Sequence, residues 1–415
     1  MRHEILCFRA DLLRGLGEVD KSISTFTEAL EASSDERQRS RAWIGLAEGL
    51  RVSDRPDEAL AALEKAESTA ASGPPLALAE MHHLRGNLYF PAGRYDDCLA
   101  QHGLALKFAQ AAGSREWEAR ALGGMGDASY LAGRMRTACG YFRDCVALCQ
   151  ELGLGRIEVA NRHMIGWSRM YLNEIKDACE DGLAAAEMAG KVGQNRAEML
   201  GRLVGGFMEI EQAHFVSARN QIEQALILAR RLRANNFVAE GLCFLSKISV
   251  AEGNNEEARR HIDEAVSVLR DVGLKFFGPL VLANAAHLTE DPEQRSRLFS
   301  EAEMVLQKGC VSHNYFWFYR DAIEAALEFE DWDRAERYAD ALEAYAHAEP
   351  LPWSDLFVAR ARALGRFGRG ERGSELSDEI NRLALAIRTA NLKAHLSLLE
   401  DAMGTLHHRK TSADP

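Results

Sequence analysis

The chain has 415 residues, of which 47% are hydrophobic and 27% charged, and its formal net charge at pH 7 is −12. This acidic balance argues against nucleic acid or an anionic membrane as the main partner, because both carry negative charge themselves. No uncharged apolar stretch reaches the ~20 residues that a membrane-spanning helix requires, and residues 1–15 lack the apolar core of a signal peptide. We therefore expect a cytoplasmic protein.

The clearest pattern along the chain is a 40-residue period. An alanine recurs at this spacing four times, and Cys98 holds the same place one period earlier; the four are Ala138, Ala178, Ala218 and Ala258. Apolar or small residues follow at four and seven positions, as Phe142 and Cys145 do after Ala138. Self-similarity of this kind is typical of a stacked-repeat protein.

Each period predicts two amphipathic helices, which we call helix A and helix B. In the second unit, Trp43 and Leu46 mark helix A, and Ala59 and Leu63 mark helix B. This is the tetratricopeptide (TPR) frame, in which small residues let the two backbones approach. The turn between the helices is occupied mostly by residues that tolerate positive φ, namely Gly17, Asp54, Gly93, Gly133, Asn173, Ala213 and Gly253.

After residue 270 the frame weakens. The sequence predicts a degenerate eighth unit around Phe299, a ninth over 315–345, a tenth over 353–390 and a closing helix over 393–402. We therefore divide the chain into regular repeats over 1–270, degenerate aromatic-rich repeats with a capping helix over 271–403, and a disordered tail over 404–415. The fold predicted is an all-α, right-handed superhelical solenoid of about ten TPR-like helix-turn-helix units.

The first predicted helix begins without a cap. Its alignment with the frame leaves Ile5, Leu6 and Phe8 on an open face. A solenoid end that exposes apolar side chains normally has a neighbour, so we expect an upstream domain or a partner chain to contact this face.

The motifs of catalysis, metal binding and cofactor binding are missing from the sequence. Cys145 and Cys149 lie one helical turn apart, but no further ligand stands near enough to complete a zinc site. The glycines of residues 123–126 fall inside a predicted helix A, where small residues serve packing. We expect no enzyme activity, no metal and no cofactor.

The inner face of the stack offers the best binding surface. In stacked units helix A lines the concave side, and its positions in units three to five supply the candidate partner-binding residues His83, Asn87, Phe90, Asp127, Tyr130, His163, Trp167 and Met170. Arg120 falls on the same face. A groove of this composition suits an extended peptide or a helix of a partner protein. The alternative is that apolar members such as Trp167 and Met170 pack between neighbouring helices.

The five consecutive aromatic residues at 315–319 cannot all face one core, because successive helical residues sweep the whole circumference. This helix is either buried on all sides or offers an aromatic patch to a partner.

Several longer strings resemble a bacterial multidomain family, and they span nearly the whole chain: 83–90, 155–161, 164–167, 309–321, 331–333, 336–339 and 349–355. The family is that of class III adenylate/guanylate cyclases joined to an ATPase domain and a C-terminal TPR arm. In it the cyclase and nucleotide-binding motifs lie N-terminal to the arm, and neither set of motifs is found among these residues. The resemblance implies an arm without the family's activity.

The function expected is that of a non-catalytic TPR protein–protein interaction and regulatory arm, associated with a cyclase/ATPase signalling module. Two alternatives stay open: an independent TPR scaffold or adaptor, and the sensor arm of an ATP-dependent transcription activator. A cyclase or ATPase coding region directly upstream would favour the regulatory arm, and unrelated DNA there would favour the scaffold.

Overall fold

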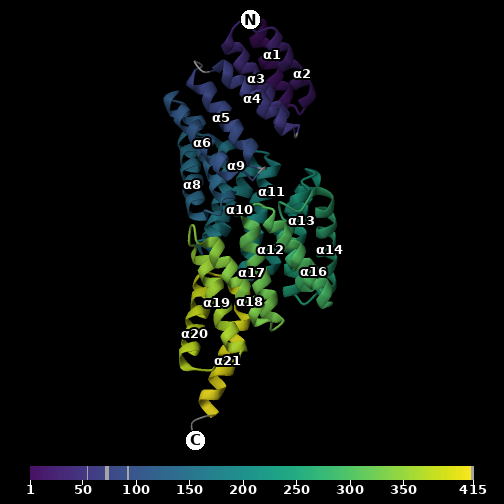
Figure 1. The fold of residues 1–415 in the computed structure, drawn as a ribbon, viewed down its shortest axis with the longest axis vertical. Coiled ribbons are helices and arrows are strands. Elements are labelled where there is room, and N and C mark those ends of the chain that lie inside the picture. Colours follow the sequence, from purple (N-terminus) through teal and green to yellow (C-terminus); the bar gives the residue numbers. More distant parts are fainter. Residues whose placement is uncertain (54, 71–73, 91–92, 413–415) are drawn as a thin grey trace. The chain divides into compact units, whose positions relative to one another are not determined.

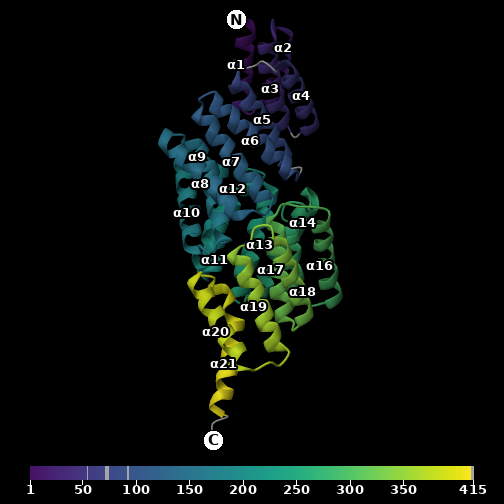
Figure 2. The same ribbon diagram turned by 60° about the vertical axis from the view of Figure 1, so that its left-hand side comes forward.

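The computed structural model describes residues 1–53, 55–70, 74–90 and 93–412. Within these ranges all regular structure is helical, and the helices follow one another as hairpins (Figure 1, Figure 2). The prediction of an all-α fold built from repeated helix-turn-helix units is therefore confirmed. Asp54, one of the predicted turn residues, lies outside the described residues.

Ten hairpins lead from Arg2 to Thr389 in the part of the chain that the structure describes. Each consists of a helix A followed by a helix B. In chain order they are α1 (Arg2–Gly15) and α2 (Val19–Glu31), α3 (Glu36–Val52) and α4 (Pro56–Ala70), α5 (Pro75–Tyr89) and α6 (Tyr95–Ala111), α7 (Arg115–Leu131) and α8 (Met135–Leu152), α9 (Gly155–Met170) and α10 (Ile175–Lys191), α11 (Asn195–Glu211) and α12 (Phe215–Arg231), α13 (Asn235–Ala251) and α14 (Asn255–Val272), α15 (Gly278–Leu288) and α16 (Pro292–Gln307), α17 (His313–Glu328) and α18 (Trp332–Ala346), and α19 (Pro352–Gly368) and α20 (Ser374–Thr389).

The turns carry the positive φ values that the period predicts. The turn residues of helix A have φ of 82° at Gly17, 72° at Gly93, 77° at Gly133, 60° at Asn173, 61° at Ala213 and 76° at Gly253. A second series, which the sequence pattern did not reveal, ends helix B at Gly113, Gly153, Gly193, Arg233 and Gly273. These residues let the chain reverse while its amides satisfy the last carbonyl groups of the helix, as when Ser114 N donates to Ala109 O over 2.9 Å.

Small residues bring helices A and B into close contact, as the frame requires. The recurring alanines and Cys98 are fully buried. The ring of His102 on α6 occupies the space left by two glycines: a Cβ added to Gly86 on α5 would lie 2.5 Å from His102 Nε2, and one added to Gly124 on α7 would lie 2.2 Å from Cε1. The glycines of residues 123–126 are thus part of a helix, and Gly124 serves packing.

The chain forms two compact units. Unit 1 comprises Met1–Leu131 with Gly140–Glu158, and unit 2 comprises Ala132–Cys139 with Val159–Pro415. This division follows spatial contacts, whereas the division drawn from the sequence at residue 270 marks a loss of repeat regularity.

The exposed face of α1 in unit 1 is apolar. Ile5 and Phe8 are exposed, as expected, and Leu12 and Leu16 extend the same surface. Leu6 differs from the expectation: it is buried in the core formed with α2 and α3, because it lies on the opposite side of the helix from Ile5 and Phe8.

The core of unit 2 is aromatic. Trp317 on α17 contacts Trp167 on α9, Phe207 on α11 and Phe244 on α13, with ring centroids 5.2, 5.4 and 6.2 Å away. Of residues 315–319, Phe316, Trp317 and Phe318 are buried and Tyr315 and Tyr319 are half-buried. Helix α17 therefore lies across the helix-A face of α9, α11 and α13.

Two short elements complete unit 2, a 3-10 helix η1 (Lys393–His395) and α21 (Ser397–Ser412). The backbone of α21 continues into the range expected as a tail from residue 404, and residues 413–415 lie outside the described residues. Within the described part of the chain, no helix is both long and apolar enough to cross a membrane. All eight cysteines are free, and seven of them are buried.

Candidate partner-binding groove

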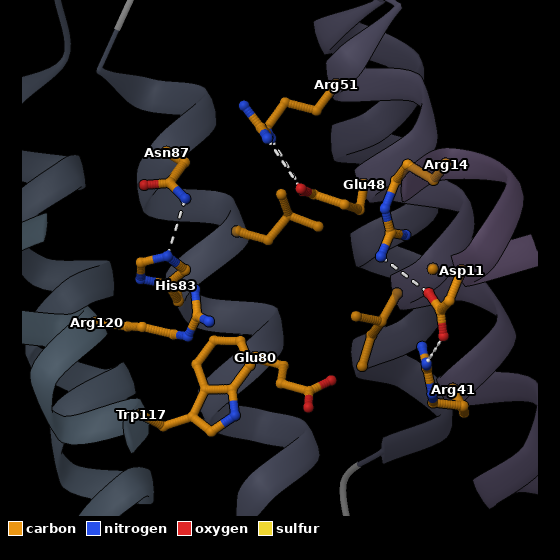
Figure 3. A pocket seen from close by; sticks show the side chains of 13 residues that line it. Asp11, Arg14, Arg41, Glu48, Arg51, Glu80, His83, Asn87, Trp117 and Arg120 are labelled. Carbon is orange, nitrogen blue, oxygen red and sulfur yellow. Dashed lines mark hydrogen bonds and ion pairs between the residues drawn. The ribbon is translucent and has the colours of Figure 1, made fainter. Parts of the chain in front are cut away.

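A groove of about 440 Å³ opens on the helix-A side of unit 1. Four successive A helices line it, namely α1, α3, α5 and α7 (Figure 3). The side chains come from the inner positions of these helices, where the repeat places residues that do not face helix B. The sequence thus determines which side of the hairpins forms the wall.

Most charged side chains in this groove are paired. Asp11 accepts hydrogen bonds from Arg14 over 2.9 Å and from Arg41 over 2.5 Å. Glu48 accepts two from Arg51, each over 2.9 Å. These carboxylates hold three guanidinium groups in place along α1 and α3.

Arg120 and Trp117 form the wall contributed by α7. The Arg120 guanidinium lies 5.2 Å from the Trp117 ring centroid and pairs with Glu116 over 2.8 Å. This stacking fixes a planar cation beside an aromatic face, a combination frequent where proteins bind peptides.

Glu80 on α5 differs from the other groove carboxylates. It is half-buried, and no described residue forms a hydrogen bond or ion pair with it. Burial raises the pKa of Glu80, and the positive charge of Arg41 opposes this rise. The carboxyl group is therefore held in the groove without a partner of its own.

His83 and Asn87 lie side by side on α5. Asn87 Nδ2 donates to His83 Nε2 over 3.1 Å, so the ring proton belongs on Nδ1, which has no partner among the described residues. Burial lowers the pKa of His83 to about 3, and the imidazole is neutral at pH 7. Both predicted residues thus line the groove, and one buried N–H donor is left free.

Asp127 lies one period after Asn87, on α7, but it does not line the groove. It is half-buried and has no hydrogen-bond partner among the described residues. Burial raises the pKa of Asp127 to about 7. Of the remaining candidates in unit 1, Tyr130 is buried and Phe90 is half-buried at the end of α5.

Replacing Asp127 with asparagine should raise the free energy of unfolding by roughly 1–3 kcal/mol at pH 8, and by much less at pH 5. The folded-state pKa of Asp127 lies above its ordinary value of 3.8, so the wild type loses stability as the pH rises from about 4 to about 7 and the neutral amide does not. Urea denaturation at both pH values measures this, with the exposed Asp144→Asn as control. A gain that is the same at both pH values would show that the charge of Asp127 is not its cause.

The candidates in unit 2 are buried. Trp167 packs against Phe207 and Trp317 at centroid distances of 5.5 and 5.2 Å, and Met170 is fully buried. His163 is also buried, which lowers its pKa to about 4. Both side chains are thus packed inside the helical stack, as the alternative interpretation has it, and α17 covers Trp167.

A network of charged side chains occupies the helix-A side of unit 2. Arg320 on α17 lies 2.9 Å from both Glu211 and Asp321, and Lys247 pairs with Asp321 over 2.9 Å. His395 of η1 pairs with Glu211 over 3.0 Å. A cavity of about 320 Å³ beside this network is lined partly by η1, so the chain's own C-terminal segment takes up this face.

Several groove residues were not among the predicted ones, notably Asp11, Arg41, Glu80 and Trp117. The predicted residues come only from the inner positions of unit three and later units, so the groove residues on α1 and α3 are not among them. A signal existed within that range, since Glu80 and Arg120 occupy equivalent places one period apart. In the described residues no group of three or more His, Cys, Asp or Glu side chains is arranged to hold a metal ion.

Comparison with known proteins places the chain by fold. The family model for the tetratrico peptide repeat matches residues 4–88, that is, α1 through most of α5. No curated protein sequence matches the chain.

The solved structures that share the fold include the following three. The apo form of the quorum sensor NprR from B. thuringiensis has 13% identity and a TM-score of 0.60, over 83% of this chain and 97% of that one. The apo form of RapI has 14% identity and a TM-score of 0.55, over 65% and 99%. NprR in complex with its cognate peptide NprX has 13% identity and a TM-score of 0.51, over 78% and 97%. At such identities the likeness shows a TPR-like helical stack and no more.

Proposed function

We propose that unit 1 binds a peptide or an extended segment of a partner protein in the groove between α1, α3, α5 and α7, and that the chain is a non-catalytic protein-interaction arm. The observation that carries this proposal is that four successive A helices jointly line an open groove, into which Glu80 places a half-buried carboxylate that has no partner among the described residues. Such a carboxylate gains from a ligand, because leaving a desolvated polar group unpaired costs free energy. Trp117 adds a rigid apolar surface of the kind that dominates binding energy.

The fold supports the same proposal. NprR, which has a similar helical stack, has been solved in complex with a peptide. In this chain the corresponding side of unit 2 is filled by α17 and η1, so the groove of unit 1 is the surface that we assign to the partner.

The regulatory form of this proposal is that the arm controls a nucleotide cyclase or ATPase module. Its support is the resemblance of residues 83–90 and 309–321 to the TPR arms of such proteins, together with the exposed apolar face of α1, where Phe8 is 66% and Leu16 76% exposed. This face is available to a neighbouring domain or chain. The exposed face by itself does not distinguish the regulatory arm from an independent scaffold or from the sensor arm of a transcription activator.

The binding proposal is tested by selecting peptides from a random phage-displayed library on the immobilised protein. We expect the wild type to enrich a common sequence pattern, and the Asn87→Arg variant to bind those peptides at least about tenfold more weakly, which corresponds to about 1.4 kcal/mol. The longer side chain enters the groove and removes the bond to His83. Gln110→Arg, which likewise replaces an amide side chain with arginine but at an exposed position of α6, is the matched control.

If Asn87→Arg folds normally by circular dichroism and retains the selected peptides as well as Gln110→Arg does, the groove is not the binding site. The proposal likewise fails if the wild type enriches no peptide.

A further inference from the structure

The groove of unit 1 contains charged side chains of both signs, and ion pairs between them do not neutralise all of these charges. Asp11 is shared by Arg14 and Arg41, so one carboxylate faces two guanidinium groups and one positive charge is in surplus on the side of α1 and α3. Glu48 with Arg51, and Arg120 with Glu116, are one-to-one pairs. The surplus is therefore confined to the cluster around Asp11.

The opposite imbalance lies on α5. Glu80 has no partner within ion-pair distance, although Arg41 and Asp11 are the charged groups that influence it most. Figure 3 shows its side chain pointing into the groove, toward the side where Arg41 and Asp11 lie. One surplus cation and one unpaired carboxylate thus face the same space without reaching each other.

Neither the Glu80 carboxylate nor the second guanidinium on Asp11 has an ion-pair partner of its own among the described residues. A half-buried carboxylate loses much of its hydration, and only an added donor or cation restores what it has lost. The Arg41 side chain is 41% exposed and keeps more of its hydration, but it shares Asp11 with Arg14 and lacks the bidentate carboxylate that a guanidinium binds most strongly. The three helices that carry these groups, α1, α3 and α5, are fixed by the hairpin packing. The missing partners of Glu80 and of the second guanidinium are therefore supplied by a bound segment.

We propose that the partner segment carries one acidic and one basic side chain a few residues apart, the carboxylate binding the Arg14–Arg41 pair and the cation binding Glu80. This inference rests on the proposed function and specifies its ligand. A segment with uncharged side chains fills the groove but leaves both charges unpaired. A segment of one sign satisfies one of them and is repelled by the other.

Four pools of fluorescently labelled synthetic peptides test the charge requirement by fluorescence polarisation. The pools share a degenerate uncharged background and carry an acidic and a basic residue, an acidic residue alone, a basic residue alone, or neither. We expect the wild type to bind the mixed pool at least about tenfold more tightly than the uncharged pool, a difference of about 1.4 kcal/mol. Salt should weaken this preference.

Two variants separate the binding contributed by the basic residue of the peptide from that contributed by its acidic residue. Glu80→Gln should lose the advantage given by the basic residue and keep that of the acidic one. Arg41→Gln should do the reverse, because Arg14 and Asp11 are then balanced. The matched controls are Glu64→Gln on α4 and Arg39→Gln on α3, both exposed and outside the groove.

The outcomes distinguish this inference from the function on which it rests. If the wild type binds all four pools equally and Asn87→Arg still abolishes binding, the groove binds peptides and the charge requirement is wrong. If Asn87→Arg leaves binding of every pool unchanged, the binding site itself is wrong. A mixed-pool preference that survives both Glu80→Gln and Arg41→Gln would also overturn the assignment of these residues.

Discussion

Replacing Arg320 with alanine should lower the free energy of unfolding by about 3–5 kcal/mol. The Arg320 side chain is 1% exposed, and its guanidinium lies 2.9 Å from Glu211 and from Asp321. Truncation leaves two buried carboxylates without this partner, and an unpaired buried charge costs more than the pair contributes. Lys247 and His395 remain beside these carboxylates and keep the loss within this range.

Urea denaturation followed by circular dichroism measures this loss. Arg362→Ala is a matched control, because Arg362 also pairs with two carboxylates, Asp340 and Glu343 over 2.8 and 2.7 Å, but is 36% exposed. We expect a loss of at most about 1 kcal/mol there. Equal losses in the two variants would contradict the role assigned to burial.

The loss in free energy of unfolding caused by Arg320→Ala should also become smaller as the pH falls from 7 toward 4. In the wild type burial raises the pKa of Asp321, but the charges of Arg320 and Lys247 and their hydrogen bonds together outweigh this effect, and the pKa is about 2. Without Arg320 the carboxyl takes up a proton at a higher pH, which relieves the buried charge. A deficit that is constant over this range would point to lost packing alone.

Replacing Gly124 with alanine should destabilise the protein by about 1–3 kcal/mol, although alanine is the better helix former. The added Cβ would lie 2.2 Å from His102 Cε1. The ring cannot retreat, because Gly86 of α5 confines it on the other side. The contact must therefore be relieved by moving a helix.

A double-mutant cycle tests this explanation. In a His102→Ala background the same Gly124→Ala exchange should cost less than about 0.5 kcal/mol, because the obstructing ring is gone. Gly103→Ala is the control: it lies on the same helix as His102, and an added Cβ there meets nothing within 4 Å. It should stabilise the protein by about 0.5–1 kcal/mol. An undiminished cost of Gly124→Ala in the His102→Ala background would place its cause elsewhere.

The two units use the same repeat in different ways. Asn87 lines an open groove in unit 1, whereas Trp167 and Phe207, which occupy the equivalent places of later repeats, are buried beneath α17 in unit 2. Position in the frame alone therefore does not make a residue available to a partner. Availability depends on what later helices cover.

The sequence by itself determined the hairpins of this protein. The 40-residue frame predicted the helix pairs up to residue 270, the buried alanines and the left-handed turn residues from Gly17 to Gly253, and weaker helical patterns predicted the three degenerate pairs after them. These features follow from interactions within one hairpin, since helical periodicity, steric freedom at positive φ and the helix A–helix B contact all involve neighbours in sequence. Local patterns are enough to specify them.

Only the tertiary structure decided which inner positions line an open groove and which are covered. Glu211 meets Arg320 and His395 from parts of the chain that are 109 and 184 residues away in sequence, and Trp317 closes over Trp167 in the same way. Such pairings depend on how far successive hairpins turn and on where the last helices return, and no local pattern encodes these. The open groove lined by α1, α3, α5 and α7, with its unpaired charges, likewise depends on the tertiary structure.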